Sequence, residues 1–371
     1  MSAPFALAAG GTGGHLFPAE ALAGELAAGG RQVHLLTDSR VDSFAAQIPG
    51  VTFHKLRAGR LGAGPVRTAY ALGGLAAGAV QARRLLRRLM PAAVIGFGGY
   101  PSVPTMLAAA SLGLPTLIHE QNAVLGRANR LLAPRVWRIA TGFAETAGLR
   151  RGARERAVHT GNPVRRAILA LGDASYSAPE PDGAVELLVL GGSQGAHILA
   201  EIVPTAVARL PQGLRRRLHV SQQARPEDLA AVVTAYREAG VSADIESFFA
   251  DVPQRLARAH LVICRAGAST VAELGAVGRP ALLIPYPHAT DDHQTANAAA
   301  FAAAGGGRAI RQADLGADGF AAELEKLLGD GAVLLLMAQR AAAFGRRDAA
   351  RRLADLALSL RPGEALEECA A

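Results

Sequence analysis

Short apolar runs that end in glycine or a polar residue alternate along this chain with longer stretches of helical periodicity. In the first half, the apolar runs are FALAAG, QVHLLTD, AAVIGFG and PTLIHE. Buried parallel strands have this uninterrupted apolar character, and the helices between them form the crossovers. The pattern therefore predicts successive βαβ units.

The second half repeats the alternation with VELLVLGG, LRRRLHVS, ADIESFF, HLVICRAG and RPALLIPYP. With 371 residues, the chain is too long for one compact core. We expect an N-terminal domain over 1–163 and a C-terminal domain over 164–342, with the helical tail over 343–371 packing back on the first domain. Both domains are predicted to be doubly wound α/β folds, in which ligands bind at the carboxyl ends of the strands.

Two glycine-rich turns, each between a predicted strand and a predicted helix, stand out. They are Gly10-Gly11-Thr12-Gly13-Gly14-His15 and Gly191-Gly192-Ser193-Gln194-Gly195-Ala196-His197. Such turns present backbone N–H groups and a helix N-terminus to a phosphate or diphosphate. One turn of this kind is as often a purely structural feature, but its repetition favours anion binding.

A dinucleotide cofactor is one alternative for the first turn. Asp38 follows the second predicted strand, where a dinucleotide-binding fold keeps an acid for the ribose. The G-x-G-x-x-G pattern fails, however, because Leu16 occupies the third glycine position. Neither turn ends in Gly-Lys-Ser/Thr, so the Walker A pattern fails as well. We therefore expect no bound cofactor.

Composition narrows the class of protein. The chain carries 39 Lys and Arg against 31 Asp and Glu, and the resulting net charge of +8 favours anionic partners. Two cysteines, Cys264 and Cys369, support neither a disulfide framework nor a zinc site and indicate a reducing compartment. The N-terminus lacks the basic segment of a signal peptide. Glycine or proline interrupts the apolar stretches 68–81 and 101–118, so we expect no membrane-spanning helix.

The segment CRAGASTVAE, residues 264–273, places a predicted helix directly after an apolar strand. Ser269 and Thr270 fall in the first turn of that helix, beside exposed N–H groups that suit a diphosphate. Glu273 lies about one turn further along, as 3.6 residues make a turn. There it either reaches a ribose diol or only complements the helix dipole.

The polar run PYPHATDDHQTANA, residues 285–298, follows another strand end. His288, Asp291, Asp292 and His293 belong to metal-binding residue types, but their spacing matches no zinc pattern. Glutamine and asparagine both donate and accept hydrogen bonds, which suits sugar hydroxyls, so we favour sugar recognition over a metal. The chain has no Asp-x-Asp, the usual metal motif of nucleotide-sugar transferases.

Seven ordered segments carry a family resemblance. They are GGTGGHLFPA (10–19), GFGGYPSVP (96–104), HEQNAVLGRAN (119–129), TGNPVR (160–165), GGSQGA (191–196), CRAGASTVAE (264–273) and DDHQTANA (291–298). Together they resemble the MurG family, the UDP-N-acetylglucosamine:undecaprenyl-pyrophosphoryl-MurNAc-pentapeptide N-acetylglucosaminyltransferases. The segment Ser221-Gln222-Gln223-Ala224 departs from the family, which often has His-Gln-Ser/Thr-Gly there.

The resemblance implies a GT-B fold, with two Rossmann-like domains facing a central cleft. The implied UDP-GlcNAc contacts are Thr12, Gly13, Gly14, Asn122, Arg165, Ser193, Phe249, Ala268, Ser269, Thr270, Glu273, His293 and Gln294. Among these, Ser193 and Arg165 would hold the diphosphate, while Glu273 would bind the ribose. The backbone of Phe249 would read the uracil. The implied acceptor contacts are Gly10, Gly11, Gly98, Gly99 and Tyr100, with His15, Glu120 and Asn122 on the same wall.

The implied reaction is displacement of UDP from the anomeric carbon of GlcNAc by the 4-hydroxyl of MurNAc, with inversion and without a metal or cofactor. It needs a base for the hydroxyl proton. His15 is the first candidate, because the pKa of an imidazole lies near neutral pH. Its rival role is binding the acceptor diphosphate, and Glu120 is the alternative base.

A lipid-linked acceptor implies peripheral attachment at the cytoplasmic face of the membrane. Residues 55–88 join two basic segments across an apolar stretch, which suits anionic lipid, although a buried helix with a solvated basic end has the same pattern.

Another GT-B enzyme of UDP-sugars, such as an epimerase, is the nearest alternative to the implied function. A nucleic-acid-binding protein is disfavoured, since aromatic residues make up only 5% of the chain and few lie among the arginines.

Overall fold

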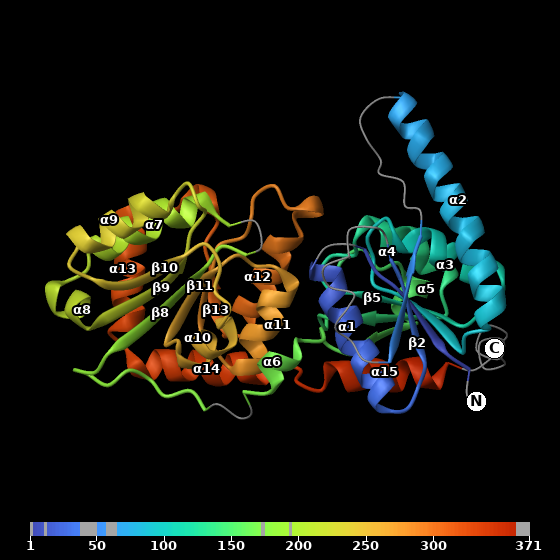
Figure 1. The fold of residues 1–371 in the computed structure, drawn as a ribbon. Coiled ribbons are helices and arrows are strands. Elements are labelled where there is room, and N and C mark those ends of the chain that lie inside the picture. Colours follow the sequence, from blue (N-terminus) through green and yellow to red (C-terminus); the bar gives the residue numbers. More distant parts are fainter. Residues whose placement is uncertain are drawn as a thin grey trace. The chain divides into compact units, whose positions relative to one another are not determined.

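The computed structural model describes residues 3–10, 13–37, 50–56, 65–171, 175–192 and 195–360, with the side chains of 65–72 left aside. The chain forms two compact units (Figure 1). The N-terminal unit comprises Met1–Arg165 and Arg347–Ala371, and the C-terminal unit comprises Arg166–Arg346. The expected boundaries after residues 163 and 342 lie within four residues of these divisions.

A parallel sheet in the order β3-β2-β1-β4-β5-β6-β7 forms the centre of the N-terminal unit. Its strands are β1 (Phe5–Ala8), β2 (Val33–Thr37), β3 (Val51–Lys55), β4 (Ala93–Gly96), β5 (Thr116–Glu120), β6 (Arg138–Thr141) and β7 (Ala157–His159). The order reverses direction at β1, which pairs with both β2 and β4. Such a reversal leaves a crevice at the carboxyl ends of the central strands, where ligands bind in doubly wound folds.

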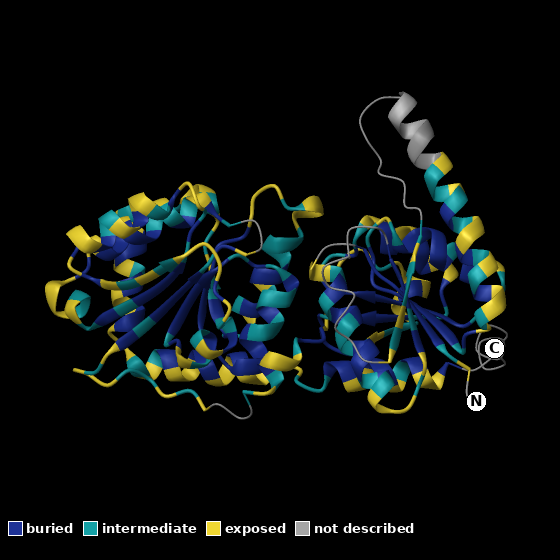
Figure 2. Cartoon of the chain, in the orientation of Figure 1, coloured by how far each residue is buried: buried dark blue, intermediate teal, exposed yellow. Residues whose placement is uncertain are grey.

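Helices cover both faces of this sheet, and Figure 2 shows its central strands, β1, β4 and β5, as buried. They are α1 (Gly13–Ala28), α2 (Pro65–Leu89), α3 (Ser102–Ser111), α4 (Arg127–Leu132), η3 (Ala133–Arg135) and α5 (Arg151–Arg154), with α15 (Ala349–Ser359) from the end of the chain. One apolar cluster joins Leu7 of β1 to Leu22 of α1 and Leu353 of α15. Ala6 points to the opposite face, where it packs with residues of α2, α3 and α4 such as Leu86.

The C-terminal unit has a parallel sheet in the order β10-β9-β8-β11-β12-β13. Its strands are β8 (Val185–Leu190), β9 (Leu218–Gln223), β10 (Ser242–Glu246), β11 (Leu261–Cys264), β12 (Ala281–Leu283) and β13 (Gly307–Ala309). The order reverses at β8, so this sheet repeats the plan of the first. The repetition of the strand-and-helix pattern predicted from the sequence is confirmed.

The helical elements of the C-terminal unit are α6 (Arg166–Leu169), α7 (His197–Ala208), α8 (Gln212–Arg217), α9 (Leu229–Glu238), α10 (Val252–Arg258), α11 (Ala268–Val277), η4 (Thr290–Asp292), α12 (His293–Ala303), η5 (Gln312–Asp314), α13 (Ala317–Leu328) and α14 (Gly331–Phe344). Leu199 of α7, Val232 of α9 and Leu324 of α13 share one apolar cluster with the sheet. Cys264 is fully buried in β11, as expected of a small strand residue, and burial raises the pKa of its thiol to about 12.

Among the described residues, no single helix is both long and apolar enough to cross a membrane. The helical segments Ala317–Leu328 and Gly331–Ser359 reach the required length and apolar character only when they are counted together as one bent pair. Leu324, Leu327 and Leu334 of this pair lie in the apolar cluster of the C-terminal unit, so their apolar surface already packs within the protein.

Candidate active site

A chain of polar side chains begins at His15, at the carboxyl edge of the N-terminal sheet. Nδ1 of His15 lies 3.1 Å from Oε1 of Gln121, which directly follows β5. The amide nitrogen of Gln121 donates to the carbonyl oxygens of Phe97 at 3.0 Å and His119 at 3.1 Å, and it lies 3.1 Å from Nδ1 of His119. This nitrogen therefore faces three acceptors, which directs the side-chain oxygen of Gln121 toward His15.

The same contacts select the tautomers of both neutral histidines. Because Oε1 of Gln121 can only accept, Nδ1 of His15 carries the proton and Nε2 keeps the lone pair. His119 accepts from Gln121 at Nδ1 and donates from Nε2 to the carbonyl oxygen of Gly161, 3.1 Å away. Burial lowers the pKa of His119 to about 4, so this ring is neutral near pH 7. The network thus presents Nε2 of His15 as the basic nitrogen.

Glu120, the alternative base, lies beside this network, but both of its carboxylate oxygens already accept hydrogen bonds. Its Oε1 accepts from the backbone nitrogen of Asn122 at 3.0 Å and from Nδ2 of Asn122 at 3.2 Å. Its Oε2 accepts from the backbone nitrogen of Gly126 at 2.8 Å and from Nδ2 of Asn129 at 2.9 Å. A carboxylate has about four lone-pair sites, so these four donors occupy all of them. Glu120 is 2% exposed, and its contacts hold the loop that follows β5.

Two glycines allow the backbone to approach the ring of His15. Gly98 and Gly99 have φ values of 82° and 73°, which disfavour other residues. A Cβ on Gly99 would lie 3.2 Å from Cδ2 of His15, and a Cβ on Gly98 would lie 3.4 Å from Cε1. Tyr100, the next residue, is 43% exposed. A Cβ on Gly10 would lie 3.6 Å from Cα of Gly99, so these residues gather at one edge of the unit.

The other site residues predicted in the N-terminal unit do not join this polar network in the described contacts. Gly13 and Gly14 open α1 and are exposed. The guanidinium of Arg165 lies over the ring of Phe17, 5.6 Å from its centroid. Gly11, Thr12 and Asp38 lie outside the described residues.

In the C-terminal unit, the second glycine-rich turn joins β8 to α7. Gly192 and Gly195 have φ values of 78° and 66°. A Cβ on Gly191 would lie only 2.6 Å from the backbone nitrogen of Ala196, so this position excludes a side chain. The side chain of Arg225 packs over Gly195. Ser193, expected to hold the diphosphate, lies outside the described residues.

The helix expected to hold the sugar nucleotide, α11, begins at Ala268, directly after the turn that follows β11. Ser269 and Thr270 are half-buried in its first turn. Within the described part of the structure, the buried Oγ of Ser269 makes no hydrogen bond. Glu273 is half-buried about one turn further along the helix.

The polar run 285–298 forms η4 and the start of α12. Asp291 and Asp292 have φ values of 53° and 51°, a backbone conformation that is strained for residues other than glycine. Nδ1 of His293 lies 2.7 Å from the carbonyl oxygen of Thr290, so Nδ1 donates and Nε2 is the acceptor in the neutral ring. Over the described ranges, no three His, Cys, Asp or Glu side chains are grouped closely enough to hold a metal ion.

Gln294 connects two loops at the carboxyl edge of this sheet. Its Oε1 accepts from the backbone nitrogens of Ala266 at 3.2 Å and Tyr286 at 3.0 Å. Because the oxygen is used in this way, the amide nitrogen of Gln294 is the group that offers donors to a ligand. The fully buried Asn297 donates to the carbonyl oxygen of Ala266 at 3.0 Å and braces the same loop.

Phe249, predicted to read a uracil through its backbone, follows β10. Its side chain is 3% exposed, whereas that of Phe248 is 72% exposed. Ser221, at the position that departs from the family pattern, accepts a hydrogen bond from Arg255 in α10.

Sequence reasoning did not assign roles to Gln121, His119, Asn129 or Arg255. Gln121 and His119 stand within the HEQN segment, at the strand end where ligands are expected, and this position was the available signal. Arg255 follows Asp251 by four residues, which indicates only a helical ion pair. Its contacts with other elements exist only in the folded unit.

Comparison with known proteins identifies the family. The N-terminal domain model of glycosyltransferase family 28 matches residues 5–141, and the C-terminal domain model matches residues 186–353. A UDP-N-acetylglucosamine–N-acetylmuramyl-(pentapeptide) pyrophosphoryl-undecaprenol N-acetylglucosamine transferase of Rhodospirillum centenum is 57% identical over 359 residues, which are 96% of this chain and 94% of that protein. The protein of the same name from Paramagnetospirillum magneticum is 55% identical over 97% of each chain.

Among solved structures, the crystal structure of Acinetobacter baumannii MurG aligns with a TM-score of 0.78 and 29% identity, over 96% of this chain and 99% of that one. The two parallel α/β sheets and this alignment confirm the predicted GT-B fold class. The chain belongs to the MurG family within glycosyltransferase family 28.

Proposed function

We propose that this enzyme transfers GlcNAc from UDP-GlcNAc to the 4-hydroxyl of MurNAc in undecaprenyl-pyrophosphoryl-MurNAc-pentapeptide, a lipid intermediate of peptidoglycan synthesis. The names of the relatives at 57% and 55% identity supply the substrates. The contact between Nδ1 of His15 and Gln121 is the structural observation that supports the chemistry. It orients one basic nitrogen at an edge where a sugar hydroxyl has to lose its proton.

In this mechanism, Nε2 of His15 accepts the proton as the hydroxyl attacks the anomeric carbon from the side opposite UDP. A general base needs an available lone pair within hydrogen-bonding reach of the proton. The tautomer selected by Gln121 makes Nε2 the basic nitrogen of the His15 ring. Glu120 does not provide an available lone pair, because four donors already occupy its oxygens. We therefore assign the base to His15, and we assign to Glu120 the support of the loop after β5.

The C-terminal unit is proposed to bind the donor. The turn after β8 and the first turn of α11 present backbone N–H groups at the carboxyl edge of the sheet, where they stabilise negative charge on the departing diphosphate. Thr270 and Glu273 of α11 then lie along the sugar nucleotide, with Glu273 on the ribose. His293 and the amide nitrogen of Gln294 are assigned to the hydroxyls of GlcNAc.

Transfer of labelled GlcNAc from UDP-GlcNAc to lipid-linked MurNAc-pentapeptide tests this function. We expect labelled lipid product at the same rate with and without EDTA, because helix N-termini and arginine take the place of a divalent ion at the diphosphate. A rate that falls on chelation and returns with Mg²⁺ would contradict the metal-free mechanism. Release of free UDP with an epimerised sugar and no labelled lipid would identify the alternative, an epimerase.

We also propose that α2 brings the enzyme to the lipid surface. Of the segment 55–88 expected to do this, residues 57–64 lie outside the described residues. In the described part of α2, Val80, Arg84, Arg87 and Arg88 are exposed, and their spacing of four, seven and eight residues puts them on one helix face. An exposed apolar side chain followed by arginines on the same helix face suits an anionic membrane surface. Flotation with anionic vesicles that weakens in salt is expected, and equal flotation with neutral vesicles would refute the electrostatic contribution.

A further inference from the structure

The turn that follows β10 combines a buried anchor with an exposed backbone. The side chain of Phe249 is 3% exposed, while its neighbours Phe248 and Ala250 are exposed. A turn of this kind can present backbone N–H and C=O groups to a ligand, because its one buried side chain fixes its position. The turn also lies at the carboxyl edge of the sheet, where ligands bind in this class of fold.

Arg255 of α10 covers that anchor. The centre of its guanidinium lies 4.1 Å from the centroid of the Phe249 ring, a stacking distance at which a cation is attracted to an aromatic face. The Arg255 side chain is only 11% exposed. Because both partners are largely withdrawn from water, this contact is stronger than the same pair would be on the surface.

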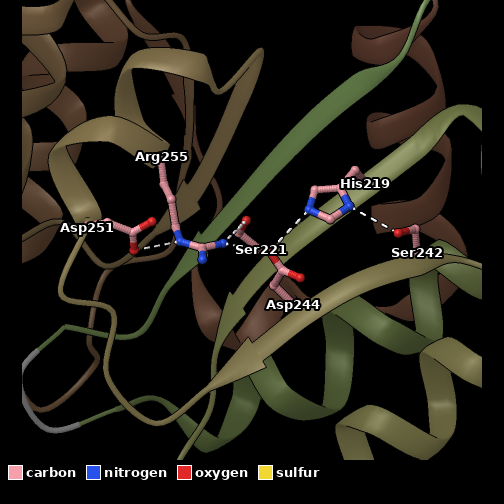
Figure 3. A network of polar contacts seen from close by, with 6 residues as sticks. All are labelled: His219, Ser221, Ser242, Asp244, Asp251 and Arg255. Atoms are coloured by element: carbon pink, nitrogen blue, oxygen red, sulfur yellow. Dashed lines mark hydrogen bonds and ion pairs between the residues drawn. The ribbon is translucent and has the colours of Figure 1, made fainter.

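Hydrogen bonds fix the plane of the guanidinium (Figure 3). Its Nε donates at 2.9 Å to Oδ1 of Asp251, the N-cap residue of α10. Its Nη1 donates to Ser221 Oγ in β9 at 2.7 Å and to Asp244 Oδ2 in β10 at 3.0 Å. Arg255 therefore ties two neighbouring strands and a helix to the ring of Phe249.

The network continues past these partners and is charged at neutral pH. Asp244 Oδ2 lies 3.4 Å from Nε2 of His219, whose Nδ1 lies 3.1 Å from Ser242 Oγ. The hydrogen bond from Arg255 is the main cause that lowers the pKa of both Asp244 and Asp251. Both carboxylates are thus ionised, and each holds the guanidinium in place.

We infer that Arg255 is a positioning residue that fixes the backbone of Phe249 for recognition of the nucleobase, and thereby makes the donor site selective for uracil. This inference rests on the proposed function, in which the C-terminal unit binds UDP-GlcNAc, and on the contact with uracil that the family resemblance implies for the Phe249 backbone. Uracil offers an N3–H donor and an O4 acceptor, whereas cytosine offers an N3 acceptor and an N4 amino donor at the same edge. A backbone that cannot move pairs with one of these patterns and not with the other. Ser221 contributes through its bond to Arg255, which gives this departure from the family pattern a role.

Binding of UDP and of CDP to the full-length protein tests the inference, with both dissociation constants measured by calorimetry. In Arg255→Met we expect UDP to bind about tenfold more weakly and CDP to change much less, because a fixed hydrogen-bonding edge discriminates more than a relaxed one. The preference for UDP should therefore shrink by roughly the same factor. Arg255→Lys keeps the charge but loses the planar stack, so its preference for UDP over CDP should lie between those of the wild type and of Arg255→Met.

Arg258→Met is the matched control, because Arg258 is exposed on the same helix and its loss removes the same charge. Ser221→Ala removes a single hydrogen bond and tests the same selectivity if Arg255→Met fails to fold. It should reduce the preference for UDP by about threefold, which corresponds to a modest loss of hydrogen-bond energy. Equal weakening of UDP and CDP in these variants would overturn the inference, because it would reduce Arg255 to a support of the fold.

The result can be separated from the test of the proposed function. A wild-type protein that prefers UDP but forms no labelled lipid would refute the acceptor assignment and leave the role of Arg255 standing. A wild-type protein that forms labelled lipid, with an unchanged preference for UDP in Arg255→Met, would refute only the inference. With saturating donor, kcat of Arg255→Met should stay within about twofold of wild type, since a residue that acts on donor binding changes mainly KM.

Discussion

Replacing His15 with alanine is expected to lower kcat by about 100-fold or more while leaving KM for UDP-GlcNAc nearly unchanged. Gln121 fixes the tautomer of the imidazole in which Nε2 is the basic nitrogen. The donor is bound by residues of the C-terminal unit in our proposal, so its affinity should not depend on His15. Initial rates with labelled UDP-GlcNAc and lipid acceptor measure both constants.

His34→Ala serves as the control, since it removes another half-buried histidine of the same unit, in β2. Its kcat should stay near the wild-type value. A second variant, Gln121→Leu, keeps His15 but removes the acceptor that orients it. Full activity in His15→Ala would exclude His15 as the base, and a raised KM for the lipid acceptor with unchanged kcat would assign it to acceptor binding instead.

Replacing Glu120 with alanine is expected to destabilise the N-terminal unit by about 3 kcal/mol or more. The change removes a carboxylate that is 2% exposed and breaks the four hydrogen bonds that it accepts. Each buried donor left unpaired costs on the order of 1–3 kcal/mol, although some of these groups will reach water. Unfolding in urea, followed by circular dichroism, gives the free energy of unfolding.

Glu155→Ala is the matched control, because the side chain of this glutamate of the same unit is 66% exposed and forms an ion pair with Arg151, which is itself on the surface. Its effect should stay below about 1 kcal/mol, as for other surface ion pairs. Loss of kcat in Glu120→Ala with an unchanged free energy of unfolding would contradict our assignment and restore Glu120 as the base.

The fold was predictable because its signals are local. Apolar runs such as VELLVL and the glycine-rich turns after them follow from backbone requirements that each segment meets by itself. The backbone around Gly191 leaves no room for a side chain, so only glycine fits there. The glycine in the sequence therefore indicates the tight turn directly. The family resemblance added the substrates, which no periodicity reveals.

The side-chain networks were not predictable, because they depend on contacts between distant segments. His15 and Gln121 are 106 residues apart in sequence, and nothing local indicates that the oxygen of Gln121 faces the ring. For the same reason, the sequence left Glu120 open as an alternative base to His15, because the four donors around Glu120 belong to the folded loop. Arg255 and Ser221 are 34 residues apart and belong to different elements, so their bond could not be inferred from spacing.

The helix α15 closes the core of the N-terminal unit, although it is the last described part of the chain to be synthesised. Leu353, Ala354 and Ala357 pack in the cluster that contains Leu7 and Leu22. Ribosomes add about 5–20 residues per second, so the stretch Arg166–Arg346 separates these partners by roughly 10 to 40 seconds. During that interval, the face of the first sheet that α1 and α15 share lacks the part of its cover that α15 supplies, and this part is open to chaperones or to aggregation. The C-terminal unit is contiguous, so the half of the protein that is made second is the first that can fold completely.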